Sequence, residues 1–168
     1  MAQIIKVVGK SNSGKTTLIE KVIPEMKKRG YRVGSVKHSH HGIEIDQPGK
    51  DSYRHKMAGA DTVVVASPDE FAVLKKAKTD DLDNLEHFFT DVDLVLVEGY
   101  KRADRPQVEV FDRKRHEEPY ALSSDNGIAG QMFAFVSDDD VVIEGVPLFK
   151  RDQVTELCDL IERRYLKK

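Results

Sequence analysis

One segment constrains the fold of this chain more than any other. It is Gly9-Lys10-Ser11-Asn12-Ser13-Gly14-Lys15-Thr16, which fits the phosphate-binding pattern G-x-x-x-x-G-K-[ST] of the P-loop. The β-branched run at residues 4–8 predicts a buried strand before it, and the apolar spacing from Lys15 to about Arg29 predicts a helix after it. A strand, a glycine-bounded loop and a helix in this order favour a phosphate site over a simple glycine-rich turn. A dinucleotide site is disfavoured because G-x-G-x-x-G is absent.

The chemistry of this segment suits a nucleoside triphosphate. Successive backbone N–H groups in a tight loop converge on one point, and the following helix adds the positive end of its dipole. Gly9 and Gly14 allow a close approach that a Cβ would block. We expect Lys15 to reach the β- and γ-phosphates and the Thr16 hydroxyl to ligate Mg²⁺. All residues from 9 to 16 are therefore candidate nucleotide contacts.

The composition indicates one globular domain over residues 1–168. The chain has 39% hydrophobic and 33% charged residues, a net charge of −2 and a single cysteine, Cys158. This balance gives no overall basic signature, and no stretch approaches the length of a membrane span, so neither a nucleic-acid nor a membrane partner is expected. Residues 1–3 lead straight into the first strand, so we expect no signal peptide. The lone cysteine favours a reducing cytoplasm.

Apolar patterns along the chain predict the three-layer α/β fold of P-loop NTPases, with a mostly parallel sheet and helices on both of its faces. A hairpin over residues 61–76 would add an antiparallel piece. Pro24 should kink the first helix, and the polar stretch 113–130 is expected to form a mobile loop. Further strands are predicted at 31–37, 61–66, 71–76, 93–98, 107–111 and 132–136, and further helices near 51–59, 82–89 and 154–161.

Acidic residues near the predicted strand ends are candidates for a metal site, because sites in parallel sheets lie at the carboxyl ends of the strands. Glu98 ends the apolar run 93–98 and is predicted to bind Mg²⁺ or to orient the attacking water, although Asp is usual there. A carboxylate without chemistry is the alternative. Gly99 would let the backbone approach the γ-phosphate. Asp46 and Asp51 are further candidates for the Mg²⁺ shell, and Asp51 could equally be a helix N-cap.

Three histidines, His38, His40 and His41, follow the strand predicted at 31–37. A metal site is disfavoured because no nearby cysteine or H-x-x-x-H pair completes a ligand set. A pocket that receives phosphates or an anionic ligand of a partner is favoured, with Lys37 adding positive charge. An ordinary polar loop has comparable weight.

Two further groups lie after predicted strands. Lys101, Arg102 and Arg105 follow Glu98-Gly99 and either neutralise phosphates or form a solvated face. Asp138 is placed where a carboxylate could accept hydrogen bonds from N1 and N2 of guanine. The usual Asn/Thr-Lys-x-Asp motif is absent, and Asp139 and Asp140 stand beside it.

Several segments occur together, in this order, in one protein family. On these segments the chain resembles the molybdopterin-guanine dinucleotide biosynthesis protein B (MobB) family, most strongly over residues 3–112. The P-loop alone occurs in very many proteins, whereas K-H-x-H-H followed by P-G-K-D-S and E-G-[FY]-K is much more specific. The segments are the P-loop with Thr17-Leu18, Val36-Lys37-His38-Ser39-His40-His41, Asp46-x-Pro48-Gly49-Lys50-Asp51-Ser52-Tyr53, Ala58-Gly59-Ala60 and Val97-Glu98-Gly99-Tyr100-Lys101.

The resemblance implies a P-loop fold of the class that includes nitrogenase iron protein and the signal-recognition GTPases. It implies that the chain binds GTP with Mg²⁺, hydrolyses GTP weakly at most, and forms a homodimer. Members of the family assist the guanylyltransferase that joins GMP to molybdopterin. That guanylyltransferase and molybdopterin are therefore the implied partners.

The resemblance also assigns roles by position. Gly14-Lys15-Thr16-Thr17 would hold the phosphates and Mg²⁺, and Glu98 with Lys15 would carry the slow hydrolysis. The histidine segment and residues 48–51 would line the nucleotide or the partner's pterin. Lys10 sits where dimeric ATPases of this class carry a lysine that reaches the neighbouring subunit, but an exposed loop lysine is the favoured interpretation.

Two other functions would use the same loop. A small-molecule kinase needs a lid that carries arginines, for which Arg113 and Arg115 are the candidates. A regulatory GTPase for metal insertion would account for the cluster of histidines. Both are less favoured than the accessory role in molybdenum cofactor biosynthesis.

Overall fold

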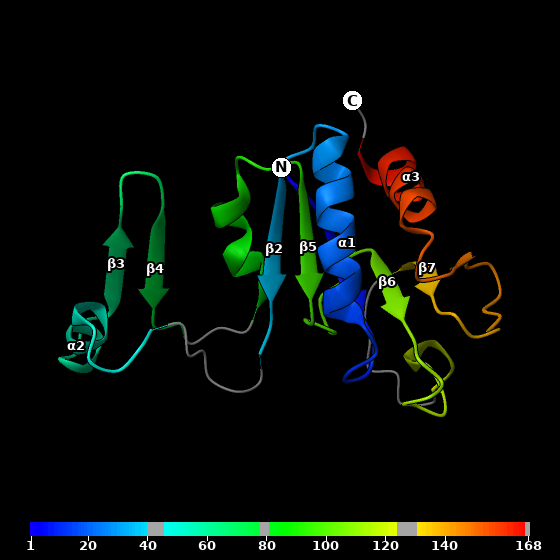
Figure 1. Cartoon of the computed structure of the whole chain (residues 1–168), viewed down its shortest axis with the longest axis horizontal. Helices are drawn as coiled ribbons and strands as arrows, with labels where there is room; N and C mark the ends of the chain where they lie inside the picture. The colour runs from blue at the N-terminus through cyan, green and yellow to red at the C-terminus, as the bar shows by residue number, and fades with distance from the viewer. Residues whose placement is uncertain (40–45, 78–80, 124–130, 167–168) are drawn as a thin grey trace. The chain divides into compact units, whose positions relative to one another are not determined.

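The structure is a computed structural model, and it describes residues 1–39, 46–77, 81–123 and 131–166 (Figure 1). It divides the chain into two compact units, which are described separately. The first holds Met1–His38 and Asp81–Lys168, and the second holds Ser39–Asp80. In the described ranges no helix combines the length and the apolar character needed to cross a bilayer. The single nucleotide-binding domain over residues 1–168 stays a prediction.

The first unit is built on a six-stranded parallel sheet in the order β2-β5-β1-β6-β7-β8. Because all strands run the same way, their carboxyl ends share one edge. The strands are β1 (Gln3–Val8), β2 (Val33–Lys37), β5 (Leu94–Glu98), β6 (Gln107–Val110), β7 (Met132–Val136) and β8 (Leu148–Phe149). The helices are α1 (Lys15–Lys28), α3 (Val154–Tyr165) and the 3₁₀ helices η1 (Leu82–Phe89) and η2 (Tyr120–Leu122).

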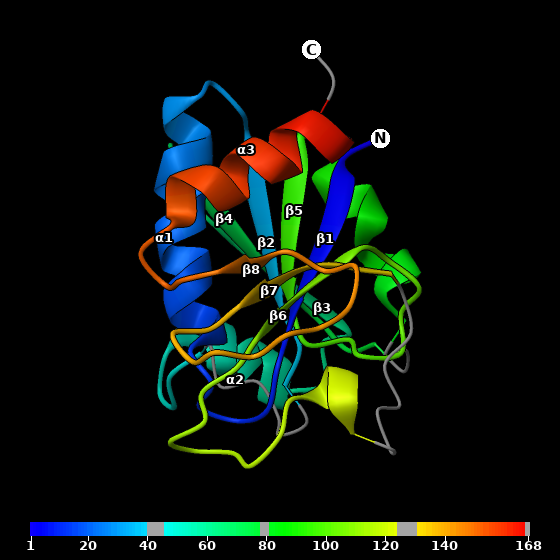
Figure 2. The same ribbon diagram turned by 90° about the vertical axis from the view of Figure 1, so that its right-hand side faces the viewer.

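The central strand β1 is buried on both faces because helices cover both faces. Ile5 and Val7 belong to the core that includes Met26 of α1. On the opposite face, Ile4 packs in a second core with Leu82 of η1. Figure 2 shows β1 and its neighbouring strands between α1 on one side of the sheet and η1 on the other. Each buried aliphatic side chain contributes about 1.5–3 kcal/mol, so this packing fixes β1 and the start of the loop that follows it.

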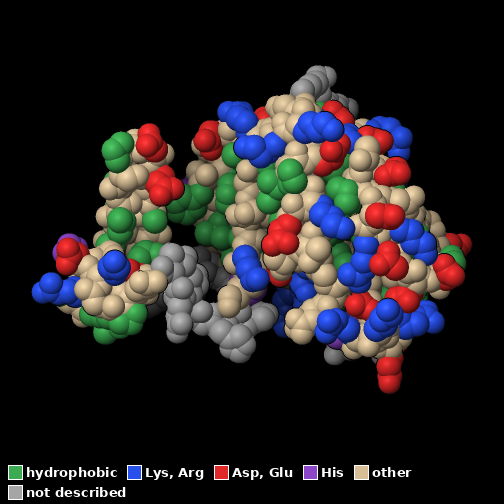
Figure 3. Space-filling view, in the orientation of Figure 1, with side chains coloured by type: hydrophobic (Ala, Val, Ile, Leu, Met, Phe, Trp, Pro, Cys, Tyr) green, Lys and Arg blue, Asp and Glu red, His purple; other side chains and the backbone are tan. Residues whose placement is uncertain are grey.

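The second unit contains α2 (Asp51–Met57) and the antiparallel pair β3 (Thr62–Ala66) and β4 (Phe71–Lys75). The turn between the strands closes through a hydrogen bond from Ser67 N–H to the Glu70 carbonyl at 2.8 Å. Large apolar side chains of this unit are exposed, and green atoms are visible on its surface in Figure 3. They are Met57, Val64, Val65, Phe71 and Val73.

The predicted fold is confirmed, including the hairpin and the helices on both faces of the sheet. The α1 helix continues through Pro24. Strand β8 was not predicted, because two residues are too few to give a periodic pattern. The mobility expected for residues 113–130 stays a prediction. Residues 113–123 contain η2, and residues 124–130 lie outside the described ranges.

Candidate functional site

Residues 9–16 connect β1 to α1 at the carboxyl edge of the sheet. Since β1 lies between β5 and β6, the ends of these two strands flank the loop. Gly14 is the N-cap of α1, with a φ of 101° in the left-handed region that favours glycine. The first N–H groups of a helix have no acceptor within it and favour an anion. The segment therefore has the strand, loop and helix context that phosphate binding requires.

Lys15 lies across this loop. Its Nζ donates a hydrogen bond to the Lys10 carbonyl at 2.8 Å. Burial lowers the pKa of Lys15, the Glu98 carboxylate opposes this change, and the ammonium groups of Lys101 and Lys37 add to it. Positive groups thus act on one another around the loop. A bound anion would relieve this repulsion.

Thr16 and Glu98 meet beside the loop. The Thr16 hydroxyl donates a hydrogen bond to Glu98 Oε2 at 2.8 Å, although the residues are 82 positions apart in the chain. The contact follows from the parallel pairing of β1 and β5, which places Val7 opposite Glu98. Lys37 Nζ lies 3.7 Å from Glu98 Oε1. Hydroxyl and carboxylate oxygens are the ligands that Mg²⁺ prefers, so this donor set fits that ion.

His38, which follows β2 in the chain, lies beside the end of β5. Its N–H donates to the Glu98 carbonyl at 2.8 Å, and its ring centroid is 4.4 Å from that of Tyr100. Gly99 has a φ of 103°, and a Cβ there would lie 2.7 Å from His38 Cβ, so the packing requires glycine. His40 and His41 lie outside the described residues. Among those that are described, no group of three or more His, Cys, Asp or Glu side chains is placed to hold a metal ion.

Tyr120 of η2, which no sequence pattern singles out, contacts two predicted site residues. Lys101 Nζ donates a hydrogen bond to the Tyr120 hydroxyl and lies 4.3 Å from the ring centroid. Lys10 Nζ lies 5.8 Å from the same centroid. Cations within about 6 Å of an aromatic ring are attracted to its face. Tyr120 therefore holds Lys10 and Lys101 on one aromatic group.

Buried charges hold the segments that carry Lys101 and Tyr120. Lys6 is fully buried on β1, and its Nζ donates to the Lys101 carbonyl at 3.0 Å. Glu109 is buried on β6 and accepts from the backbone N–H groups of Tyr120 at 2.6 Å and Ala121 at 3.0 Å. Buried side chains of the neighbouring strands β1 and β6 thus fix the positions of Lys101 and Tyr120.

Asp138, which follows β7, is bound by Arg151 in the turn between β8 and α3. The Arg151 N–H donates to Asp138 Oδ1 at 3.0 Å, and Arg151 Nε lies 3.4 Å from Oδ2. The guanidinium also donates from Nη2 to the Ser13 and Phe111 carbonyls at 3.0 Å each. The structure therefore links Asp138 to the loop. Its contact with guanine stays a prediction.

The turn after β6 makes another contact with the loop. His116 Nε2 lies 2.7 Å from the Ser11 carbonyl oxygen and donates to it in the tautomer that protonates this nitrogen. His116 joins Lys15 and Arg151 in donating to carbonyl groups of the loop. No sequence pattern identifies His116 or Arg151, because both contacts depend on tertiary structure.

Two predicted residues are held in other contacts. Arg105 pairs with Asp83 and Glu86 of η1 at 2.6 Å each. Asp46 belongs to the second unit, where its Oδ1 accepts from the Ser52 hydroxyl at 3.0 Å. Its role as a metal ligand stays a prediction.

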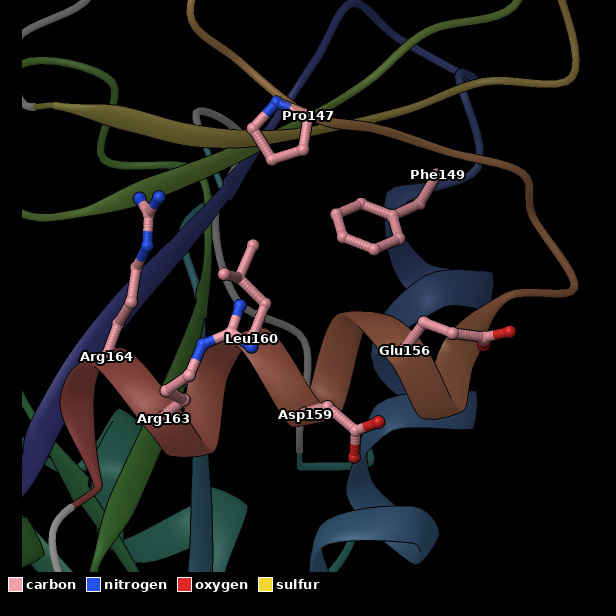
Figure 4. Close-up of a pocket in the computed structure, with 7 residues that line it drawn as sticks. All are labelled: Pro147, Phe149, Glu156, Asp159, Leu160, Arg163 and Arg164. Atoms are coloured by element: carbon pink, nitrogen blue, oxygen red, sulfur yellow. The ribbon is translucent and has the colours of Figure 1, made fainter.

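A hollow of about 510 Å³ is lined by residues of β8 and α3 and by Pro147, which precedes β8, and not by the loop (Figure 4). Pro147, Phe149 and Leu160 form its apolar part. Glu156, Asp159 and Arg163 give it charges of both signs, and Asp159 already pairs with Arg29 at 2.6 Å. The hollow therefore does not favour an anion as the loop does.

Comparisons with known proteins agree on one family. The family model of molybdopterin guanine dinucleotide synthesis protein B (MobB) matches residues 4–138. The molybdopterin-guanine dinucleotide biosynthesis adapter protein of Escherichia coli is 33% identical over an alignment of 168 residues that covers 96% of this chain and 92% of that protein. The protein of the same name from Haemophilus influenzae is 44% identical over an alignment of 108 residues that covers 62% of this chain and 61% of that protein.

The fold leads to the same family. The crystal structure of Bacillus subtilis MobB superimposes with a TM-score of 0.78 at 29% sequence identity, and the match covers 99% of each chain. The shared fold is that of P-loop NTPases. The matching family model spans the loop, Glu98 and Asp138, whereas Arg151 lies beyond it.

Proposed function

This chain belongs to the MobB family, and from this premise we propose that it binds GTP with Mg²⁺ and assists the guanylyltransferase that joins GMP to molybdopterin. One observation carries the nucleotide part of the proposal: the Thr16 hydroxyl lies 2.8 Å from the Glu98 carboxylate beside Lys15. A P-loop hydroxyl and an acidic residue on a neighbouring strand commonly serve Mg²⁺ in such proteins. The pathway is supported by the relatives' names, which describe adapter proteins of molybdopterin-guanine dinucleotide biosynthesis.

The chain's own groups would neutralise the triphosphate. Backbone N–H groups of the loop and of the first turn of α1 would face the phosphate oxygens. Lys15 would exchange its bond to the Lys10 carbonyl for a phosphate oxygen. Burial is the main cause of the lowered pKa of Lys15, and the nearby ammonium groups of Lys101 and Lys37 add to it, so their charge would also act on the phosphates.

Thr16 and Glu98 would hold Mg²⁺, which supplies positive charge beside the β- and γ-phosphates. Glu98 would orient a water molecule toward the γ-phosphate, and Lys15 would stabilise the charge that develops during slow hydrolysis. Asp138 would accept hydrogen bonds from N1–H and N2–H of guanine. Adenine does not offer these two donors together, so Asp138 would favour GTP over ATP.

The partners belong to the same proposal. We propose a homodimer that acts in the cytoplasm and docks on the guanylyltransferase, with molybdopterin as a second ligand of that assembly. The β3–β4 hairpin supports self-association because Val64, Val65 and Phe71 are exposed on it.

Calorimetric titration with GTP, ATP and GDP in the presence of Mg²⁺ tests the nucleotide proposal. Lys15→Ala should weaken GTP binding by at least about 100-fold, because it removes a charged donor to the phosphates. Lys28→Ala is the matched control, since Lys28 is exposed in the last turn of α1. Equal affinity for ATP and GTP would disprove guanine specificity. Unchanged affinity in Lys15→Ala would disprove phosphate binding by the loop.

A further inference from the structure

Arg151 is the residue that connects the loop to the ends of β6 and β7. It lies in the turn between β8 and α3, and its side chain is 30% exposed. Its Nη2 donates to the Ser13 carbonyl in the loop and to the Phe111 carbonyl after β6, each at 3.0 Å. One planar group thus joins two segments that are far apart in the chain.

The contact with the loop is close. A Cβ on Gly14 would lie 2.5 Å from Arg151 Nη1, so the guanidinium occupies the space beside the N-cap of α1. Hydrogen bonds from a charged donor are roughly twice as strong as neutral ones, and the guanidinium presents its donors in a fixed plane. Arg151 therefore restrains the peptide groups from which the loop's N–H donors project.

Arg151 also orients Asp138, through both its side chain and its backbone. The guanidinium Nε lies 3.4 Å from Asp138 Oδ2, and the backbone N–H of Arg151 donates to Oδ1 at 3.0 Å. The Asp138 side chain is still 64% exposed, so its carboxylate has room for further donors. Asp112 lies on the same guanidinium at 3.7 Å and balances its charge.

We propose that Arg151 is a positioning residue that couples guanine recognition to phosphate binding, an inference that rests on the proposed function. Its bond to the Ser13 carbonyl sets the shape of the phosphate loop. Its contacts with Asp138 set the direction of the carboxylate that reads the base. The preference for GTP over ATP therefore depends on a residue that touches neither the phosphates nor the base.

Arg151→Lys tests this coupling because it keeps the positive charge and removes the planar fork. We expect ATP affinity to fall about fivefold, since the loop is less restrained, and GTP affinity to fall about 20-fold, since Asp138 is also misdirected. Asp138→Asn alone should weaken GTP and leave ATP unchanged. Added to Arg151→Lys, it should cause little further loss of GTP affinity.

The measurement is calorimetry with GTP and ATP in Mg²⁺ on the full chain, with thermal melting to verify folding. Arg164→Lys, an exposed arginine in the last turn of α3, is the matched control and should bind as the wild type does. Should Arg151→Lys unfold, Arg151→Gln, which keeps a planar donor, takes its place. Equal losses for GTP and ATP, no loss, or losses that multiply with those of Asp138→Asn would overturn the coupling. None of these results changes the loss of GTP affinity expected for Lys15→Ala. The experiment therefore distinguishes an absence of coupling from an absence of nucleotide binding.

Discussion

The two sides of the phosphate loop use positive charge in opposite ways. On the β6–β7 side, Arg151 binds groups of the protein itself, including the Ser13 carbonyl and Asp138. On the β5 side, burial lowers the pKa of Lys15, the Glu98 carboxylate opposes this change, and the ammonium groups of Lys101 and Lys37 add to it. The guanidinium is bound by several groups of the fold, whereas the ammonium groups of Lys15, Lys37 and Lys101 lie near one another and near the single carboxylate of Glu98. We therefore expect the β6–β7 side to support the loop and the β5 side to receive the charge of the ligand.

The segments beside the loop are held by buried charges of opposite sign. Burial lowers the pKa of Lys6 to about 8, and Asp104 opposes this change. Burial raises the pKa of Glu109, and its bonds from the backbone of Tyr120 and Ala121 oppose this change. A buried charge costs free energy unless hydrogen bonds compensate it. Lys6 and Glu109 both have hydrogen bonds, but the directions of their pKa shifts indicate that these bonds compensate the cost of burial only in part. The positions of Lys101 and Tyr120 are therefore maintained at some cost in stability.

Lys6→Met tests how the β5 side is held and has the largest expected effect on stability. The pKa of Lys6 is about 8 in the folded state and 10.5 in the unfolded state. Between these values the unfolded chain binds more protons, so wild-type stability should rise as the pH increases from 8 to 10.5. The rise that Lys6 contributes is about 3 kcal/mol, and Lys6→Met should abolish it.

Urea unfolding at several pH values between 7.5 and 10.5 measures this effect, with Lys28→Met as the exposed control. An equal rise in Lys6→Met and in the wild type would show that Lys6 does not titrate in the folded protein. The segment that carries Lys101 would then not be held by a buried charge on β1.

The sequence predicts the apolar framework of the site and its first contacts. The run at 93–98 identifies β5, and the strand at 4–8 identifies β1, so parallel pairing brings Glu98 beside Thr16. Both residues end or follow strong periodic patterns, which makes them predictable. Lys6 lies within the strand predicted at residues 4–8, but the sequence does not predict which group it binds. That group is the Lys101 carbonyl, which is 95 residues away.

Arg151 and Tyr120 are not predictable in this way. Arg151 follows β8, a strand of two residues, and Tyr120 lies in a polar stretch without periodicity. Their positions depend on hydrogen bonds to Asp138 and Glu109, whose partners are set by the sheet and not by local sequence. The residues that hold the site in place thus lie in segments whose hydrophobic periodicity is weak.

Lys101→Met sharpens the comparison on the β5 side. If Lys101 contributes its charge to the ligand, its removal should weaken GTP binding about tenfold, equivalent to about 1.4 kcal/mol. The effect should decrease at high salt, because part of it is an interaction between exposed charges. Calorimetry at two salt concentrations measures both quantities. If Lys101→Met binds GTP as tightly as the wild type does, the charge of the ligand lies away from Lys101. The β5 side would then not receive the phosphates at that position.

Tyr120→Phe has the smallest expected effect and separates positioning from binding. Phe keeps the ring that attracts Lys101 and removes the hydroxyl to which Lys101 Nζ donates. We expect GTP affinity to fall about threefold, because Lys101 must then be ordered when the phosphates bind. Tyr165→Phe, in α3 against Phe133, is the matched control.

The double variant decides how Tyr120 acts. If Tyr120 works only through Lys101, then Tyr120→Phe should have no further effect on GTP affinity once Lys101→Met is present. Independent losses in the double variant would mean that the Tyr120 hydroxyl contacts the nucleotide itself. In that case the β5 side would bind its ligand with an aromatic residue as well as with ammonium groups. The two sides of the loop would then differ in the type of side chain that they use, and not only in how they use positive charge.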